Sequence, residues 1–281
     1  MPNSGLHLSY ALSALDIWSR NRSNAPFPVD DQRAADLFIY GSVAPDIGFF
    51  PGTRRDFSEL AHRNGGAGLI RLLRRSAITP AQRGYMCGWV AHLLADRVVH
   101  PLIDRAAAER LATGELQISH RPEHVAHMRV EYGLDHRLFE QDRRLQRLRL
   151  GEPPSAEELE PIRVGYADAF GERFSPGELV RGHRMLRRIV HLGAKLSQVQ
   201  TATWRRHPLS SLLRAGGRSV APPSRWLPHR ANISPILLAI LRPCPPPAWL
   251  LESVDAFQQE FPDQLVSLLN QDPEQLASAT L

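Results

Sequence analysis

The sequence has few cysteines, almost no lysine and no long apolar run. The two cysteines, Cys87 and Cys244, lie far apart and fit no metal-ligand spacing, which excludes a disulfide framework and a thiolate metal site. No apolar run approaches the ~18 residues that a membrane span needs, so we expect no stable membrane insertion. The N-terminus lacks a basic stretch followed by an apolar core. Without such a secretion signal, we expect a cytoplasmic protein.

Lysine occurs only at position 195 among 34 basic residues, and the formal net charge is +5. Arginine binds phosphate through a planar fork, so this bias would suit a phosphate-bearing substrate, although a GC-rich genome is the simpler explanation. From Leu179 to Leu251 there is no Asp or Glu, while twelve Arg and Lys residues occur. Such a positive region would suit nucleic acid, anionic lipid or an acidic partner, and equally a solvated face.

The apolar pattern is helical almost throughout, and hardly any segment alternates with a period of two residues. We therefore predict an all-α, multi-helix bundle. At 281 residues, the chain can bury one large core. The expected loop is 41–52, and the expected helices are 5–20, 30–40, 57–75, 80–99, 101–112, 122–149, 155–170, 175–203 and 247–270.

Three segments follow from this pattern. We expect residues 1–204 to form a helical domain, 205–248 a Pro- and Arg-rich lid or loop, and 249–281 a C-terminal helix that packs on the same domain. The middle segment contains a short apolar run at 233–241. This run would suit a lid over a pocket, a surface clamp, a docking segment or a loop packed onto the core.

Residues 92–100 are the most informative stretch. His92, Asp96 and His100 recur at every fourth residue, which places all three on one face of a helix. Most residues between them are apolar, and burying imidazole with carboxylate is costly unless a partner or cation compensates. A second expected helix carries His127 and Glu131 at the same spacing. Two such pairs predict a metal site with more than one metal ion.

Three further residues could join these two helical groups as metal ligands: His7, Asp46 and His62. With the two helical groups they supply five imidazoles and three carboxylates, enough for two or three zinc ions at about four ligands each. His120 or His124 could replace His127, because all three share one helical face with Glu131. The alternative is a metal-free helical protein with buried His–carboxylate pairs, which two pairs on separate helices make improbable.

The order of these eight residues resembles the ligand order of the zinc-dependent phospholipase C family, which shares its all-helical, three-zinc fold with single-strand-specific zinc nucleases. The first expected helix, with His7 before an apolar run, is also similar to the opening helix of that family. The resemblance implies one zinc at Asp46, His62 and His92, a second at His100, His127 and Glu131, and a third at His7. Asp96 would bridge the first and third. Secreted members also use their processed N-terminus as a ligand, and the Met-Pro start of this chain departs from that pattern.

The resemblance implies a zinc-dependent hydrolase that cleaves a phosphodiester or phosphomonoester by attack of a zinc-bound hydroxide. Asp46 is the candidate catalytic residue, as both ligand and proton acceptor. Ile47, Phe49 and Phe50 would line the pocket mouth and favour a small phosphoester or a lipid-like substrate. Two alternatives stay open: a zinc nuclease acting on single-stranded nucleic acid, and a metal hydrolase or cyclase for another bond or a non-catalytic metal-stabilised binding protein.

Overall fold

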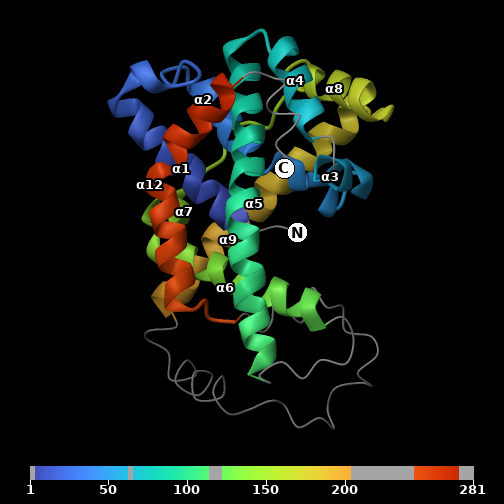
Figure 1. Cartoon of the computed structure of the whole chain (residues 1–281). Coiled ribbons are helices and arrows are strands. Elements are labelled where there is room, and N and C mark those ends of the chain that lie inside the picture. Colours follow the sequence, from blue (N-terminus) through green and yellow to red (C-terminus); the bar gives the residue numbers. More distant parts are fainter. Residues whose placement is uncertain (1–3, 63–65, 114–121, 204–243, 272–281) are drawn as a thin grey trace.

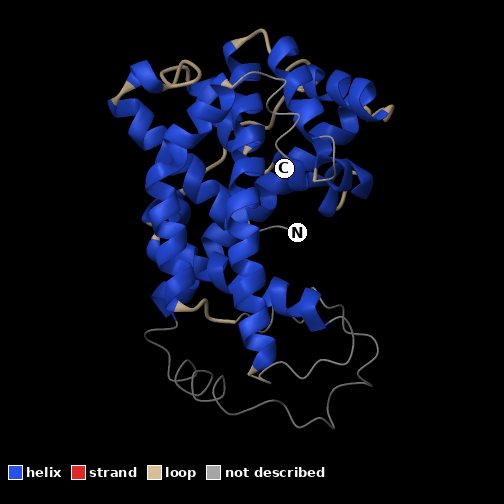
Figure 2. Cartoon of the chain, in the orientation of Figure 1, coloured by secondary structure: helices blue, strands red, loops and turns tan. Residues whose placement is uncertain are grey.

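The long helix α5 (Pro80–Ala112) runs through the middle of the molecule, and α1, α2, α4, α6 and α12 all contact it (Figure 1). The computed structural model describes residues 4–62, 66–113, 122–203 and 244–271. Within these ranges there are helices and no strands (Figure 2), so the predicted all-α fold is confirmed. No helix in the described ranges combines the length and the apolar composition needed to cross a bilayer.

Eleven further elements make up the described part of the chain. They are α1 (Ser4–Arg20), η1 (Arg22–Asn24), α2 (Gln32–Gly41), η2 (Ala44–Phe49), α3 (Arg55–Ala61), α4 (Gly66–Ser76), α6 (Pro122–Gln141), α7 (Arg143–Arg147), α8 (Glu160–Phe170), α9 (Pro176–Thr203) and α12 (Ala248–Asn270). The predicted lid or loop at 205–248 lies outside the described residues, apart from 244–248.

Several predicted boundaries were wrong. The expected break before Pro101 is absent, and α5 continues through this proline. Pro101 cannot donate a hydrogen bond to the carbonyl of Arg97, but Val99 and Ile103 on either side are buried in the core, and this packing holds the helix together. The expected helix 122–149 is divided at Asp142, whose side chain caps the short helix α7. Similarly, the expected helix 57–75 is two helices, α3 and α4.

Helix α2 lies unusually close to α5. A Cβ atom on Gly88 would overlap with the carbonyl oxygen of Phe38, and one on Gly84 would overlap with that of Ala34. The two backbones can approach this closely only because these positions lack side chains. The contact carries the end of α2, and the η2 segment that follows it, toward the middle of α5. The loop predicted at 41–52 therefore contains a short 3-10 helix whose acid, Asp46, is buried beside α5.

Helix α12 packs against α1 and α5. The ring of Tyr10 on α1 lies 5.4 Å from that of Phe257 and 5.0 Å from that of Phe261. The Tyr10 hydroxyl donates a hydrogen bond of 3.1 Å to the carbonyl of Val254. Buried aromatic rings contribute strongly to core stability, so this contact fixes α1 against α12.

Candidate metal centre

The eight predicted ligands come from five elements and meet at one place. His7 lies on α1, Asp46 on η2, and His62 directly after α3, while α5 supplies His92, Asp96 and His100 and α6 supplies His127 and Glu131. Their ligand atoms form three groups, in each of which all atoms lie within 4.8 Å of one another. The groups are His7, His92 and Asp96; Asp46, His62 and His92; and His100, His127 and Glu131.

Asp96 lies at the middle of the centre. Its Oδ1 atom is 3.3 Å from Nε2 of His7 and 3.2 Å from Nε2 of His100. Its Oδ2 atom is 3.2 Å from Nε2 of His62 and 3.3 Å from Nε2 of His92. One carboxylate thus faces four imidazoles, which come from α1, from α5 and from the end of α3, a position from which it can bridge two cations.

Backbone carbonyls fix the orientation of two of these imidazoles. His92 donates from Nδ1 to the carbonyl of Ser42 over 3.0 Å, and His62 donates from Nδ1 to the carbonyl of Ser58 over 2.7 Å. A carbonyl accepts only, so each Nδ1 carries the hydrogen and each Nε2 points a lone pair into the centre. Outer hydrogen bonds of this kind hold histidine ligands in the metal-binding tautomer.

The centre is built from acceptors that need a positive charge between them. The Nε2 atoms of His62 and His92 are only 3.1 Å apart. Asp46 Oδ1 and Glu131 Oε1 are buried and have no hydrogen-bond partner, which is costly unless a cation compensates. Nitrogen and carboxylate donors in this number suit zinc. The residues present therefore fit the metal that the sequence predicts.

Burial and neighbouring charges act in opposite directions on the pKa values of His62 and Glu131. Burial disfavours the charged form of His62, but the hydrogen bond to Asp96 and the negative charge of Asp46 outweigh it and raise the pKa of His62 to about 9. Burial raises the pKa of the Glu131 carboxyl to about 7. Without a metal ion, protons are therefore drawn to these groups, and a bound cation would displace them.

The three groups are not equally complete. His92 belongs to two of them, but its Nδ1 is bound to Ser42, so its Nε2 can serve only one ion. If that ion is the one held by Asp46 and His62, only His7 and Asp96 among the described residues are left as ligands of a third ion. The His7 ring stacks on His92 at 3.9 Å, and its buried Nδ1 has no hydrogen-bond partner.

Helix α6 presents His127, rather than His124, to the centre. His127 Nε2 lies 3.9 Å from Glu131 Oε2, whereas His124 is exposed and belongs to none of the three groups. His120, the other alternative considered from the sequence, lies outside the described residues. His100 Nε2 is 4.0 Å from Glu131 Oε1, which completes this group.

Asp104 is a residue of the centre that sequence reasoning missed. Its Oδ1 accepts a 2.7 Å hydrogen bond from His127 Nδ1 and so turns Nε2 toward Glu131. A signal was present, because Asp104 continues the four-residue spacing of His92, Asp96 and His100 along α5. Asp104 is 68% exposed, so it orients His127 without being a ligand itself.

We expect Asp104→Ala to weaken zinc binding at the His100–His127–Glu131 group by about tenfold, because His127 loses the partner that fixes its tautomer. Zinc retention in competition with a chelator measures this effect. Asp104→Asn keeps an acceptor oxygen and should restore most of the affinity. Glu109→Gln, an exposed change on the same helix, is the matched control. An Asp104→Ala protein that holds zinc as the control does would contradict this role.

Another carboxylate positions the start of α1. Asp135 on α6 accepts hydrogen bonds of 3.2 Å from the backbone N–H groups of Gly5 and Leu6. A Cβ atom on Gly5 would lie 2.7 Å from Asp135 Oδ1, so this approach requires glycine. The first N–H groups of a helix have no partner within the helix, and Asp135 accepts from two of them. Asp135 therefore anchors the helix turn from which His7 reaches Asp96.

Of the three apolar residues predicted at the mouth, Phe49 alone is partly exposed. Ile47 is fully buried and Phe50 is 7% exposed, and both pack in the core. The Phe49 ring lies 6.1 Å from the His62 ring, and the Arg55 guanidinium lies 5.9 Å from the Phe49 centroid. Phe49 and Arg55 thus flank the centre on the side where His62 is 28% exposed.

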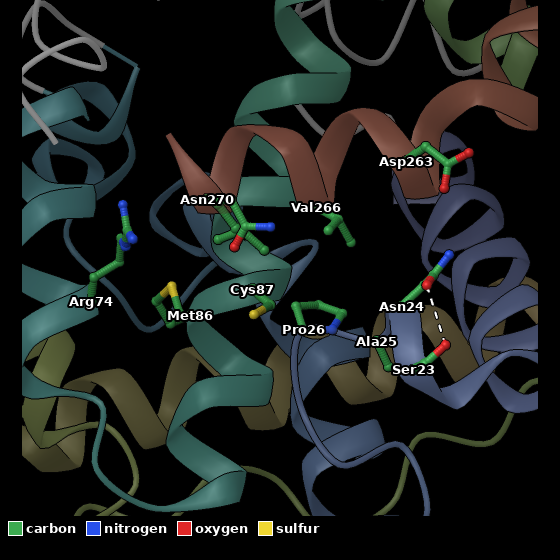
Figure 3. A pocket seen from close by; sticks show the side chains of 11 residues that line it. Ser23, Asn24, Ala25, Pro26, Arg74, Met86, Cys87, Asp263, Val266 and Asn270 are labelled. Carbon is green, nitrogen blue, oxygen red and sulfur yellow. Dashed lines mark hydrogen bonds between the residues drawn. The ribbon is translucent and has the colours of Figure 1, made fainter. Parts of the chain in front are cut away.

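A cavity away from the predicted ligands lies between η1, α4, α5 and α12 (Figure 3). It measures about 680 Å³, and its ionisable side chains are Arg74, Asp263 and Cys87. Arg74 and Asp263 lie at opposite ends of it (Figure 3). Burial raises the pKa of the Cys87 thiol to about 12, which keeps the thiol protonated and a poor nucleophile. None of the eight predicted ligands lines this cavity.

The described residues combine an all-helical fold with a candidate metal centre of clustered histidines and carboxylates. The family described as zinc-dependent phospholipase C matches residues 6–172, a segment that includes all eight predicted ligands. The chain belongs to this family. No curated protein and no solved structure shows a significant match to the chain.

Proposed function

We propose that the protein is a zinc-dependent phosphoesterase whose metal centre consists of the eight residues grouped around Asp96. Family membership supports a phospholipase C-like hydrolase in general terms. The observation that carries the proposal is the convergence of four imidazole Nε2 atoms on the Asp96 carboxylate within 3.3 Å. Clustered zinc ions lower the pKa of water to about 7 and stabilise the negative charge that develops on phosphate oxygens.

The protein residues hold and orient the reacting groups. Asp46 Oδ1 is buried, lacks a hydrogen-bond partner and lies 3.4 Å from His62 Nε2. We propose that Asp46 is both a ligand and the acceptor of the proton that the attacking water loses. The scissile phosphate would bind on the open side of the centre, beside His62 and His100, since His92 is fully buried and His100 is 36% exposed.

Phe49 supplies the apolar surface next to this opening. We propose that the alkyl or aromatic part of a phosphoester lies against the Phe49 ring, with Arg55 above the ring on the solvent side. Arg55 is 78% exposed, and its Nε lies 3.0 Å from Glu59 Oε1 one turn further along α3. This arrangement suits a small phosphoester or a lipid-like one.

Turnover of a chromogenic phosphodiester, nitrophenyl phosphocholine, tests the function. We expect hydrolysis that is abolished by chelation and restored by zinc. Single-stranded DNA should be assayed in parallel, because cleavage of DNA without turnover of the small diester would favour the nuclease alternative. A zinc-loaded protein that acts on neither would contradict the proposed phosphoesterase and favour a centre adapted to another bond, or one that only stabilises the fold.

A further inference from the structure

Helix α9 carries a second polar site that shares no residue with the metal centre. A pocket of about 340 Å³ is lined by Glu152, Pro153, Arg184, Arg187, Arg188 and His191, and we call it the arginine pocket. Its four α9 residues lie beyond residue 172, where the family match ends. Family membership therefore does not account for this pocket.

The lining has an excess of positive charge. Three guanidinium groups share the pocket with one carboxylate, Glu152, which is 80% exposed and lies 3.0 Å from Arg187. Among the residues that the structure describes, neither Arg184 nor Arg188 makes an ion pair. The chain from Leu179 to Leu251 contains no Asp or Glu, so α9 has no carboxylate after Glu178 in its first turn. Two of the three arginines are thus left for a ligand.

The wall opposite α9 is held in place before any ligand binds. His191 Nε2 accepts a 3.1 Å hydrogen bond from the backbone N–H of Leu150. Arg33 donates to the carbonyls of Glu152 and Pro153 over 2.7 and 3.2 Å. A preformed site loses less conformational entropy on binding, and this favours affinity.

We propose that the arginine pocket binds a phosphate dianion, as free phosphate or as the phosphomonoester headgroup of a lipid. The planar guanidinium of arginine matches the oxygens of a phosphate in a forked, two-bond geometry. The two unpaired arginines, Arg184 and Arg188, are one helical turn apart, which lets both reach one anion. Glu152 offsets one of the three arginine charges, and a dianion would balance the other two.

Calorimetric titration of inorganic phosphate into the zinc-loaded full-length protein tests the site. Arg184→Gln with Arg188→Gln should weaken this binding at least about tenfold, because both charge-assisted contacts are lost. Arg20→Gln with Arg75→Gln removes the same charge from exposed positions on α1 and α4 and should bind as the wild type does. Any phosphate that binds at the metal centre is common to all three proteins, so their difference reports the arginine pocket.

Sedimentation with vesicles of phosphatidic acid in phosphatidylcholine, compared with phosphatidylcholine alone, distinguishes the lipid from the free anion. The pocket is supported if the Arg184/Arg188 variant loses binding of phosphate or of phosphatidic acid while the Arg20/Arg75 control keeps it. The ligand whose binding is lost then shows whether the pocket takes the free anion or the lipid headgroup. Three results overturn it: a wild-type protein that binds neither ligand, an Arg184/Arg188 variant that binds as the wild type does, or an equal loss in the Arg20/Arg75 control.

Discussion

Asp96→Asn is expected to lose most of the bound zinc and a large part of the stability together. The carboxylate faces the Nε2 atoms of four histidines at 3.2–3.3 Å, and an amide offers only one oxygen and no charge. Removing one partner from a buried charged cluster costs about 3–5 kcal/mol of unfolding free energy. Elemental analysis and thermal unfolding of the same preparation measure both losses.

Two histidine variants outside the centre, one exposed and one buried, are controls for Asp96→Asn. His136→Ala changes an exposed residue on α6 and should affect neither zinc content nor stability. His183→Ala should lower stability but keep the zinc, because His183 is fully buried and binds the Tyr85 hydroxyl and the Leu179 carbonyl instead of the centre. If Asp96→Asn retained its zinc as His136→Ala does, Asp96 would not be the bridging ligand.

Asp46→Asn is expected to reduce kcat on nitrophenyl phosphocholine by roughly 10²–10⁴-fold, the usual contribution of a positioned general base. KM should change far less, because the lost interaction acts in the transition state. Asn keeps one oxygen that can bind a cation, so the variant must be shown to hold its zinc before rates are compared. Kinetic assays of zinc-matched preparations make this measurement.

The matched control for Asp46 is Glu160→Gln, which removes a half-exposed carboxylate from α8 that pairs with Arg163 and with no predicted ligand. It should leave kcat unchanged. A zinc-loaded Asp46→Asn protein with wild-type turnover would contradict the role of Asp46 as proton acceptor, while leaving its role as a ligand intact.

Part of the candidate metal centre could be predicted from the sequence, because the spacing on two helices is a local signal. His92, Asp96 and His100 share a helical face through their spacing alone, as do His127 and Glu131. The meeting of these helices with His7 and Asp46 depends on tertiary contacts, such as the close approach at Gly88, which no local pattern contains. For those residues the order along the chain, through its resemblance to a family, was the available evidence.

Other features could not be read from local patterns. Pro101 predicts a helix break, but the burial of Val99 and Ile103 outweighs the lost hydrogen bond. Ile47 and Phe50 flank an acid in a glycine-rich loop, which favours exposure, yet both are packed in the core. Choosing His127 over His124 required the rotation of α6 about its axis, which is fixed by packing against α5.

The zinc content of the purified full-length protein tests the central claim most directly. The three groups of ligand atoms around Asp96 predict two to three zinc equivalents by elemental analysis after growth with ample zinc. Chelation should then lower the melting temperature, since ligands on separate helices couple binding to folding. Less than one equivalent of zinc, with no effect of chelation on unfolding, would contradict the metal centre.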